Sequence, residues 1–190
     1  MSGTYPTSPG FTNVDFKEKH FQQRTESLSG SIKIHKLAGS RFEFTVTYPP
    51  MTRAEFRPVL GFLAGQRGME STFTIVLPNI SYKTSNVTGS PLVNGNSFSG
   101  STVTIDQNTG TFKAGDLIKF NSHSKVYTVT QDLTGAGVLK FYPPLRETVI
   151  NNDSIIYDAV PFTVRLANPV QEYTVNSSNL ISYEVDLIEV

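Results

Sequence analysis

The sequence predicts a mainly β fold with one α-helix and an inserted small β module. Three observations support this fold class. Several segments alternate apolar and polar side chains with a period of two, which is the spacing of a half-buried strand. One segment, at about 52–65, repeats apolar side chains at helical spacing instead. Between residues 84 and 157, short apolar runs are separated by Gly, Asn and Asp turns.

The alternating segments predict strands of a mainly antiparallel sheet system, because each buries one face and leaves the other in water. The clearest alternating runs are residues 42–48, 73–77, 162–166 and 183–187. Ile32 and Ile34 predict one further short strand, which the turn signal Ala38-Gly39-Ser40 would end.

The predicted helix has a clear start and one conflicting residue inside it. Thr52 is followed three residues later by Glu55, the spacing of a capping box that satisfies two free amide donors. A single apolar stripe follows at helical spacing, formed by Phe56, Val59, Leu60 and Leu63. Gly65 and Gly68 provide left-handed positions at which the helix ends, while Pro58 removes one helical hydrogen bond.

The composition divides the chain into two parts. Clean alternation occupies the first eighty residues and returns near residue 162, whereas the stretch between them is rich in Ser, Thr, Asn and Gly. We therefore expect a parent β domain, residues 1–83 plus 158–190, that carries the helix. Residues 84–157 would form the inserted β module.

Charge and composition exclude several functions. The chain has 190 residues, with 16 Lys and Arg against 16 Asp and Glu, so its formal net charge is zero. A neutral chain gives no electrostatic case for binding nucleic acid or an anionic membrane. The absence of cysteine excludes disulfides, thiolate nucleophiles and thiolate metal sites. No apolar run approaches the ~20 residues that span a bilayer, and the start lacks a secretory signal, so we expect synthesis in a cytosol-like compartment and no membrane insertion.

No pattern of residues predicts catalysis. The three histidines, His20, His35 and His123, lack the spacing of a metal pair. His123 lies in a polar turn, and we expect it to be solvated or hydrogen-bonded at the surface. Four acidic residues of the insertion favour turn positions over calcium ligands: Asp106, Asp116, Asp132 and Asp153. We predict a protein that is not an enzyme, with no catalytic residue, no metal and no cofactor.

Two sets of residues are candidates for a subunit interface. One set, on the predicted helix and just after it, is Arg53, Arg57 and Arg67. The other set, at five-residue spacing in an N-terminal arm, is Phe11, Phe16 and Phe21. The arginines form either a solvated face or planar hydrogen-bonded pairs with another subunit. The phenylalanines anchor the arm either on its own domain or on a neighbour.

Eight short stretches follow one another in a characteristic order along the chain. They are residues 29–34, 39–44, 48–56, 66–68, 73–75, 113–119, 126–129 and 143–146. Among them are Tyr48-Pro49-Pro50 ahead of the helix and Gly115-Asp116 in the insertion. Taken together they resemble the distal tail, or baseplate hub, proteins at the tail tip of tailed phages, and the resemblance covers most of the chain.

The resemblance implies a structural virion protein of a phage tail tip or baseplate, made in the host cytoplasm. A β-sandwich-like ring domain bearing one helix would carry the inserted module. Six copies would form a ring that connects the tail tube to the hub or receptor-binding apparatus, with other baseplate or tail-fibre proteins as further partners. Closing such a ring needs head-to-tail contacts. We expect these at strand edges, the arm of residues 1–30 and the helix, with the two sets of residues named above.

Two other functions stay open at this stage. The insertion could be a carbohydrate- or host-surface-binding β module of a tail fibre or adhesin, with exposed Tyr82, Tyr127 or Tyr142 stacking on the ligand. An enzyme that hydrolyses a cell-wall polysaccharide would instead need two carboxylates, such as Asp116 and Glu147, to converge at roughly 5–10 Å.

Overall fold

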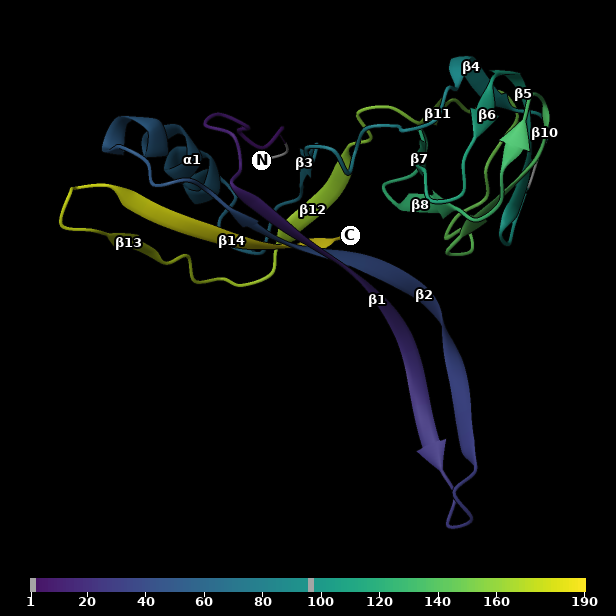
Figure 1. Cartoon of the computed structure of the whole chain (residues 1–190), viewed down its shortest axis with the longest axis horizontal. Coiled ribbons are helices and arrows are strands. Elements are labelled where there is room, and N and C mark those ends of the chain that lie inside the picture. Colours follow the sequence, from purple (N-terminus) through teal and green to yellow (C-terminus); the bar gives the residue numbers. More distant parts are fainter. Residues whose placement is uncertain (1–2, 96–97) are drawn as a thin grey trace.

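The computed structural model describes residues 3–95 and 98–190. In this part of the chain, the strands form three sheets with antiparallel pairing, and a single helix accompanies them (Figure 1). The mainly β fold predicted from the sequence is confirmed. Two of the sheets are large, and the first and last parts of the chain meet in one of them.

The first large sheet has the strand order β1-β2-β14-β12-β3, and β13 pairs with β14 beside this path. Its strands are β1 (Asn13–Glu26), β2 (Ile32–Thr47), β3 (Phe73–Ile75), β12 (Phe162–Leu166), β13 (Tyr173–Val175) and β14 (Ile181–Glu189). Every second residue of β14 is buried, as the alternating pattern predicts for a strand that covers a core with one face. This sheet contains each of the four strands expected from the clearest alternating runs.

The second large sheet lies in the insertion, with the order β11-β7-β8-β10-β5-β4. Its strands are β4 (Thr88–Val93), β5 (Thr102–Thr109), β7 (Leu117–Phe120), β8 (Val126–Val129), β10 (Gly137–Tyr142) and β11 (Ile155–Ile156), and a small third sheet pairs β6 (Thr111–Phe112) with β9 (Leu133–Thr134). Val93 N donates to Asp153 O at 3.0 Å, and Asn152 N donates to Val93 O at 2.8 Å. These bonds bring the two edges together, so the sheet is nearly closed into a barrel.

The helix α1 (Arg53–Gly65) begins where the sequence predicts. The capping box is present, because Thr52 Oγ1 accepts from Glu55 N and Glu55 Oε2 accepts from Thr52 N at 2.8 Å. Two details of the prediction are wrong. Leu60 lies off the buried stripe and is exposed, and the left-handed exit is formed by Arg67 and Gly68 rather than by Gly65.

The turn expected at residues 38–40 is also wrong. Strand β2 runs without a break from Ile32 to Thr47, through Gly39 at a φ of 102°. The pairing with β1 shifts here, since His20 pairs with Ser40 but Gln22 pairs with Lys36. Three residues of β2 therefore oppose one residue of β1, and the glycine accommodates a bulge in a long hairpin instead of ending a short strand.

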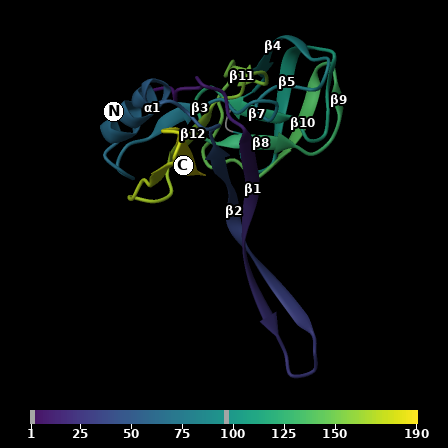
Figure 2. The same ribbon diagram turned by 60° about the vertical axis from the view of Figure 1, so that its left-hand side comes forward.

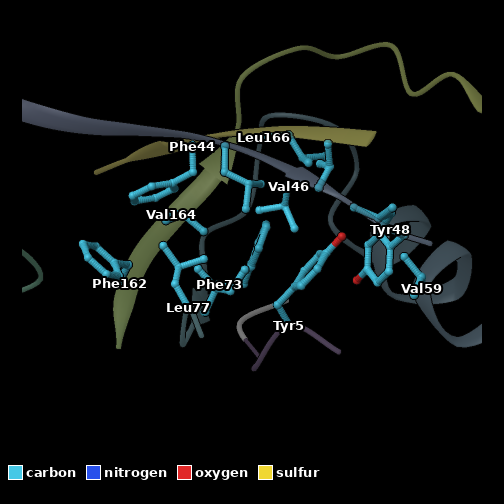
Figure 3. Close-up of a cluster of buried hydrophobic side chains, with 14 of the residues drawn as sticks. Tyr5, Phe44, Val46, Tyr48, Val59, Phe73, Leu77, Phe162, Val164 and Leu166 are labelled. Atoms are coloured by element: carbon cyan, nitrogen blue, oxygen red, sulfur yellow. The ribbon is translucent and has the colours of Figure 1, made fainter. Parts of the chain in front are cut away.

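Buried apolar side chains form two clusters. The sheet cluster joins β2, β3, β12, β14, α1 and Tyr5, and it includes Phe44, Phe73 and Phe162 (Figure 3). Val126 at the start of β8 also belongs to this cluster. The module cluster contains buried residues from Val87 to Ile155. The division into residues 1–83 plus 158–190 and residues 84–157 stays a prediction, because only independent unfolding of the two clusters would test it.

The hairpin of β1 and β2 projects away from both clusters (Figures 1 and 2). Its root lies between the first sheet and the inserted module, and its tip extends far beyond them. This projection gives the molecule its most prominent free surface.

Candidate assembly surfaces and a buried charged joint

The distal half of the hairpin, residues 22–35, has two different faces. Glu26 pairs with Ile32 and Arg24 pairs with Ile34, so these four side chains share one face. Ile32 and Ile34 are 50% and 62% exposed, and Leu28 in the connecting turn is fully exposed. Arg24 and Glu26 form an ion pair at 3.0 Å on the same face, so this face combines exposed apolar side chains with a charged pair.

The turn at the tip is held by its own hydrogen bonds. Ser27 N donates to Ser31 O at 2.9 Å, and Ser31 N donates to Ser27 Oγ at 3.1 Å. Gly30 adopts a φ of 77°, the left-handed conformation that such a turn requires. The exposed tip is therefore an ordered turn that presents Leu28 to its surroundings.

The three phenylalanines predicted as arm anchors lie along β1 and just before it. Phe16 packs in the root of the hairpin, with its ring centroid 4.8 Å from that of Phe42. Phe11 makes an edge-on contact with Tyr48 at 5.2 Å. Phe21 is only half-buried, and the Arg41 guanidinium lies 5.7 Å from its ring centroid. Phe11 and Phe16 thus pack on their own domain, and a role of any of the three in an interface stays a prediction.

The arginines predicted as interface residues do not lie together. Arg53 and Arg57 line an open groove of about 1080 Å³ between α1 and β13. The apolar part of this groove includes Leu60 and Val175, which are 41% and 57% exposed. Arg67 lies beyond the other end of the helix. The groove offers positive charge beside an apolar surface, and its use as an interface remains untested.

The histidines and acidic residues differ from the expectation in two places. His123 is 5% exposed, so its predicted surface position is wrong: Nδ1 lies 3.0 Å from Tyr127 Oη and the ring packs on Phe120. Asp106 lies within β5 rather than in a turn. Asp132 is an exposed turn residue, and its hydrogen bond from Lys113 Nζ lowers the pKa of its carboxyl. Among residues 3–95 and 98–190, no group of three His, Asp or Glu side chains is placed to hold a metal ion.

The three tyrosines proposed for ligand stacking differ in their exposure. Tyr127 is completely buried, so its predicted exposure is wrong. Tyr142 is half-buried, with Oη 3.3 Å from His20 Nδ1. Tyr82 is 52% exposed. Asp116, the carboxylate considered for catalysis, is buried and accepts from Lys113 N at 2.9 Å, which is the bonding of a turn residue.

A cluster that sequence reasoning missed joins the inserted module to the first sheet. We call Lys119, Lys125 and Glu189 the charged joint. Lys125 and Glu189 form an ion pair with side chains that are 1% and 0% exposed. Lys119 Nζ donates to Pro161 O at 3.2 Å and to Thr163 Oγ1 at 3.1 Å. The signal in the sequence was the position of Glu189, because it continues the buried alternation of β14 two residues after Leu187.

None of the helices in the described part of the chain combines the length and the apolar character required to span a membrane.

Comparison with known proteins gives two matches. A family model described as the B domain of distal tail protein pb9 matches residues 80–160. Distal tail protein pb9 of Escherichia phage T5 is 25% identical over 173 residues, which cover 87% of this chain and 84% of that protein. The family match falls on the inserted module, and the full-length similarity extends to the first sheet.

Proposed function

Because the chain belongs to the distal tail protein family of tailed phages, we propose that it forms a ring that joins the tail tube to the hub or receptor-binding apparatus. As a distal tail protein it is a structural protein of the tail tip, located in the virion tail. The ring of six copies, its attachment to the tube and hub, and the absence of catalytic residues, metal and cofactor are parts of this proposal.

The projecting hairpin is the observation that supports the proposed ring. An isolated two-stranded hairpin is at best marginally stable in water. The distal half pairs β1 only with β2 in the described chain, and three apolar side chains there, Leu28, Ile32 and Ile34, are exposed beside the Arg24–Glu26 ion pair. A neighbouring subunit that covers this face would supply the missing contacts, which supports assembly over a free monomer.

A ring also needs a second, different surface on each copy, because its contacts are head-to-tail. The groove lined by Arg53 and Arg57 is a candidate, since it combines exposed apolar side chains with two exposed cations. Arginine is enriched at interfaces because its planar group forms several hydrogen bonds at once. Phe21 and Arg67 are separate candidates at other contacts.

Light scattering of the purified chain tests the ring. We expect a mass several times the 20.9 kDa of one chain, and electron microscopy should show closed rings. Arg53→Glu should weaken self-association by at least about fivefold, because interface residues that matter typically contribute more than 1 kcal/mol. Lys140→Glu is the matched control, since it reverses an equally exposed charge on the inserted module.

One outcome would reject the ring. If the protein stays a monomer at high concentration, and also fails to assemble when tail-tube protein is added, the proposal is wrong. Equal effects of Arg53→Glu and Lys140→Glu would keep the ring but remove the groove from its interface.

A second candidate function rests on a smaller groove, of about 340 Å³, where the hairpin root meets the inserted module. Its lining includes Tyr82, Glu18, Thr84 and Asp116. An exposed aromatic ring beside hydroxyl and carboxylate groups suits a saccharide, which needs stacking together with a few polar contacts. A glycan array probed with the full chain tests this function. Binding that Tyr82→Ala abolishes and Tyr173→Ala preserves would support it.

A further inference from the structure

Glu189 is placed where the inserted module meets the first sheet, beside the root of the hairpin that belongs to this sheet. Its Oε1 accepts from Val126 N at 2.8 Å, at the start of β8 in the inserted module. Its Oε2 accepts from Phe42 N at 3.1 Å, in the root of the hairpin, and also forms the ion pair with Lys125. Glu189 itself lies at the end of β14 in the first sheet. One carboxylate therefore binds donors from both the module and the hairpin.

We propose that the Glu189 carboxylate is a latch that holds the inserted module in one fixed orientation relative to the first sheet, which includes the root of the hairpin. The two parts then move as one rigid body. This inference goes beyond the ring, because it concerns a single chain and holds whether or not copies assemble.

The chemistry of the contact favours a latch over simple adhesion. Apolar side chains adhere in many relative orientations, because the hydrophobic effect is not directional. A buried carboxylate is costly unless all of its donors are in place, so any other orientation of the module leaves Glu189 and Lys125 buried without partners. Lys125 Nζ also lies 4.3 Å from the ring centroid of Phe42. Phe42 therefore contacts both partners of the ion pair, Lys125 through its ring and Glu189 through its amide.

Burial and the negative charge of Glu189 have opposing effects on the pKa values of the two buried lysines. It lowers the pKa of Lys125, while the negative charge of Glu189 raises it. Burial lowers the pKa of Lys119 as well, with Glu189 again acting against it. Glu18 and Arg146 are the other charged groups that act on Lys125. Glu189 is thus the group that keeps two buried cations compatible with the junction.

Further contacts cross the same junction. Lys119 binds Pro161 O and Thr163 Oγ1, and His20 on β1 contacts Tyr142 on β10. These contacts keep the module attached when the latch is lost. The expected effect of breaking the latch is therefore a looser angle between the parts, without release or unfolding of the module.

Distance measurements between spin labels test the latch in the full chain. The chain has no cysteine, so two introduced cysteines carry the labels without interference. Lys140→Cys on the module can be paired with Thr174→Cys on β13 or with Lys17→Cys near the hairpin root, and all three side chains are exposed. We expect one narrow distance distribution for each pair in the otherwise unchanged chain. A broad distribution there would by itself overturn the proposal.

Glu189→Gln removes the latch with almost no change of shape. The amide has one acceptor oxygen, and its NH₂ group faces donors that the carboxylate accepted. We expect both distance distributions to broaden about twofold and the amides of Phe42 or Val126 to exchange hydrogen about tenfold faster, as for a lost buried hydrogen bond. Glu184→Gln is the matched control on the same strand, because Glu184 is exposed and accepts only from Thr47 Oγ1.

Lys125→Met gives an independent second variant. It removes the cation but leaves the two amide donors of Glu189, so the distributions should broaden in the same direction as for Glu189→Gln. If either folded variant shows unchanged distances and unchanged exchange at Phe42 and Val126, the latch is refuted. If Glu184→Gln broadens the distributions equally, the effect does not belong to the buried carboxylate and the proposal is also refuted.

Discussion

Gly110 in the inserted module lies against the backbone of Asn86, and its substitution tests this close approach. Gly110 lies between β5 and β6 at a φ of 88°. A Cβ atom at this position would meet the backbone oxygen of Asn86 at 2.4 Å. The neighbourhood is already fixed, because Thr111 N donates to Asn86 Oδ1 at 2.9 Å and Gly135 N donates to Gly110 O at 3.0 Å. Gly110→Ala therefore forces backbone against backbone.

Gly100→Ala separates the cost of the left-handed backbone conformation from the cost of the steric contact with Asn86. Gly100 has nearly the same backbone conformation, with a φ of 84°, but an added Cβ would find nothing within 4 Å. An alanine in the left-handed region costs about 1 kcal/mol, which is all that Gly100→Ala should lose. Gly110→Ala adds a steric cost of about 1–3 kcal/mol, so its total loss should be about 2–4 kcal/mol.

Urea unfolding followed by hydrogen exchange measures both the loss and its location. We expect Gly110→Ala to speed exchange throughout the module cluster, while the sheet cluster keeps its protection except beside the charged joint. Equal losses for the two variants would show that the close approach to Asn86 is not the cause. Simultaneous loss of protection in both clusters would refute the division into residues 1–83 plus 158–190 and residues 84–157.

Three further predictions concern the sheet cluster and the helix. Burial raises the pKa values of Tyr5 and Tyr183 above the ordinary 10.0, and that of Tyr48 to about 12. The folded chain then keeps phenolic protons that the unfolded chain releases, so the free energy of unfolding is constant below pH 10 and falls as the pH rises toward 12. The midpoint of urea unfolding should therefore be lower at pH 11 than at pH 9. Thr52→Ala should cost about 1 kcal/mol through loss of the cap, and Thr52→Ser almost nothing, in the same assay. Phe162→Ala should cost about 3–5 kcal/mol, because the buried ring lies 4.9 Å from that of Phe44, and the lost protection should be confined to the sheet cluster.

The parts of the fold that the sequence predicted are those whose pattern reflects burial on one side. Strands β2, β12 and β14 alternate because each covers the sheet cluster, and α1 was predicted because Thr52 and Glu55 carry its cap. The strand at Ile32 and Ile34 was predicted, but its partner, residues 22–26 of β1, was missed for the same physical reason. Residues 22–26 cover no core and are all exposed, so nothing imposes the period of two by which a strand is recognised.

The errors about single residues have a different origin. The sequence predicted His123 in a surface turn and Tyr127 as an exposed aromatic side chain. The closure of the barrel buries both, and a hydrogen bond joins them. Burial of this kind depends on which strands meet across the sheet, and that information is not local in the sequence. Glu189 is the opposite case, since its place in the β14 alternation already indicated a charged residue on a buried face.

The proposed latch and the proposed ring are connected by the geometry of the hairpin. From Ser40 at the root to Ile32 near the tip, β2 spans eight residue steps, or about 26 Å at a rise of about 3.3 Å per residue. A rotation of about 10° at the root would then move the tip by about 4.5 Å, which is as large as the 4.0–4.5 Å over which apolar side chains are in contact. The tip can dock reproducibly on a neighbour only if the root is held at a fixed angle. The phenylalanine packing around Phe42 and the bond from its amide to Glu189 hold the root at this point, so loosening the latch should also weaken assembly.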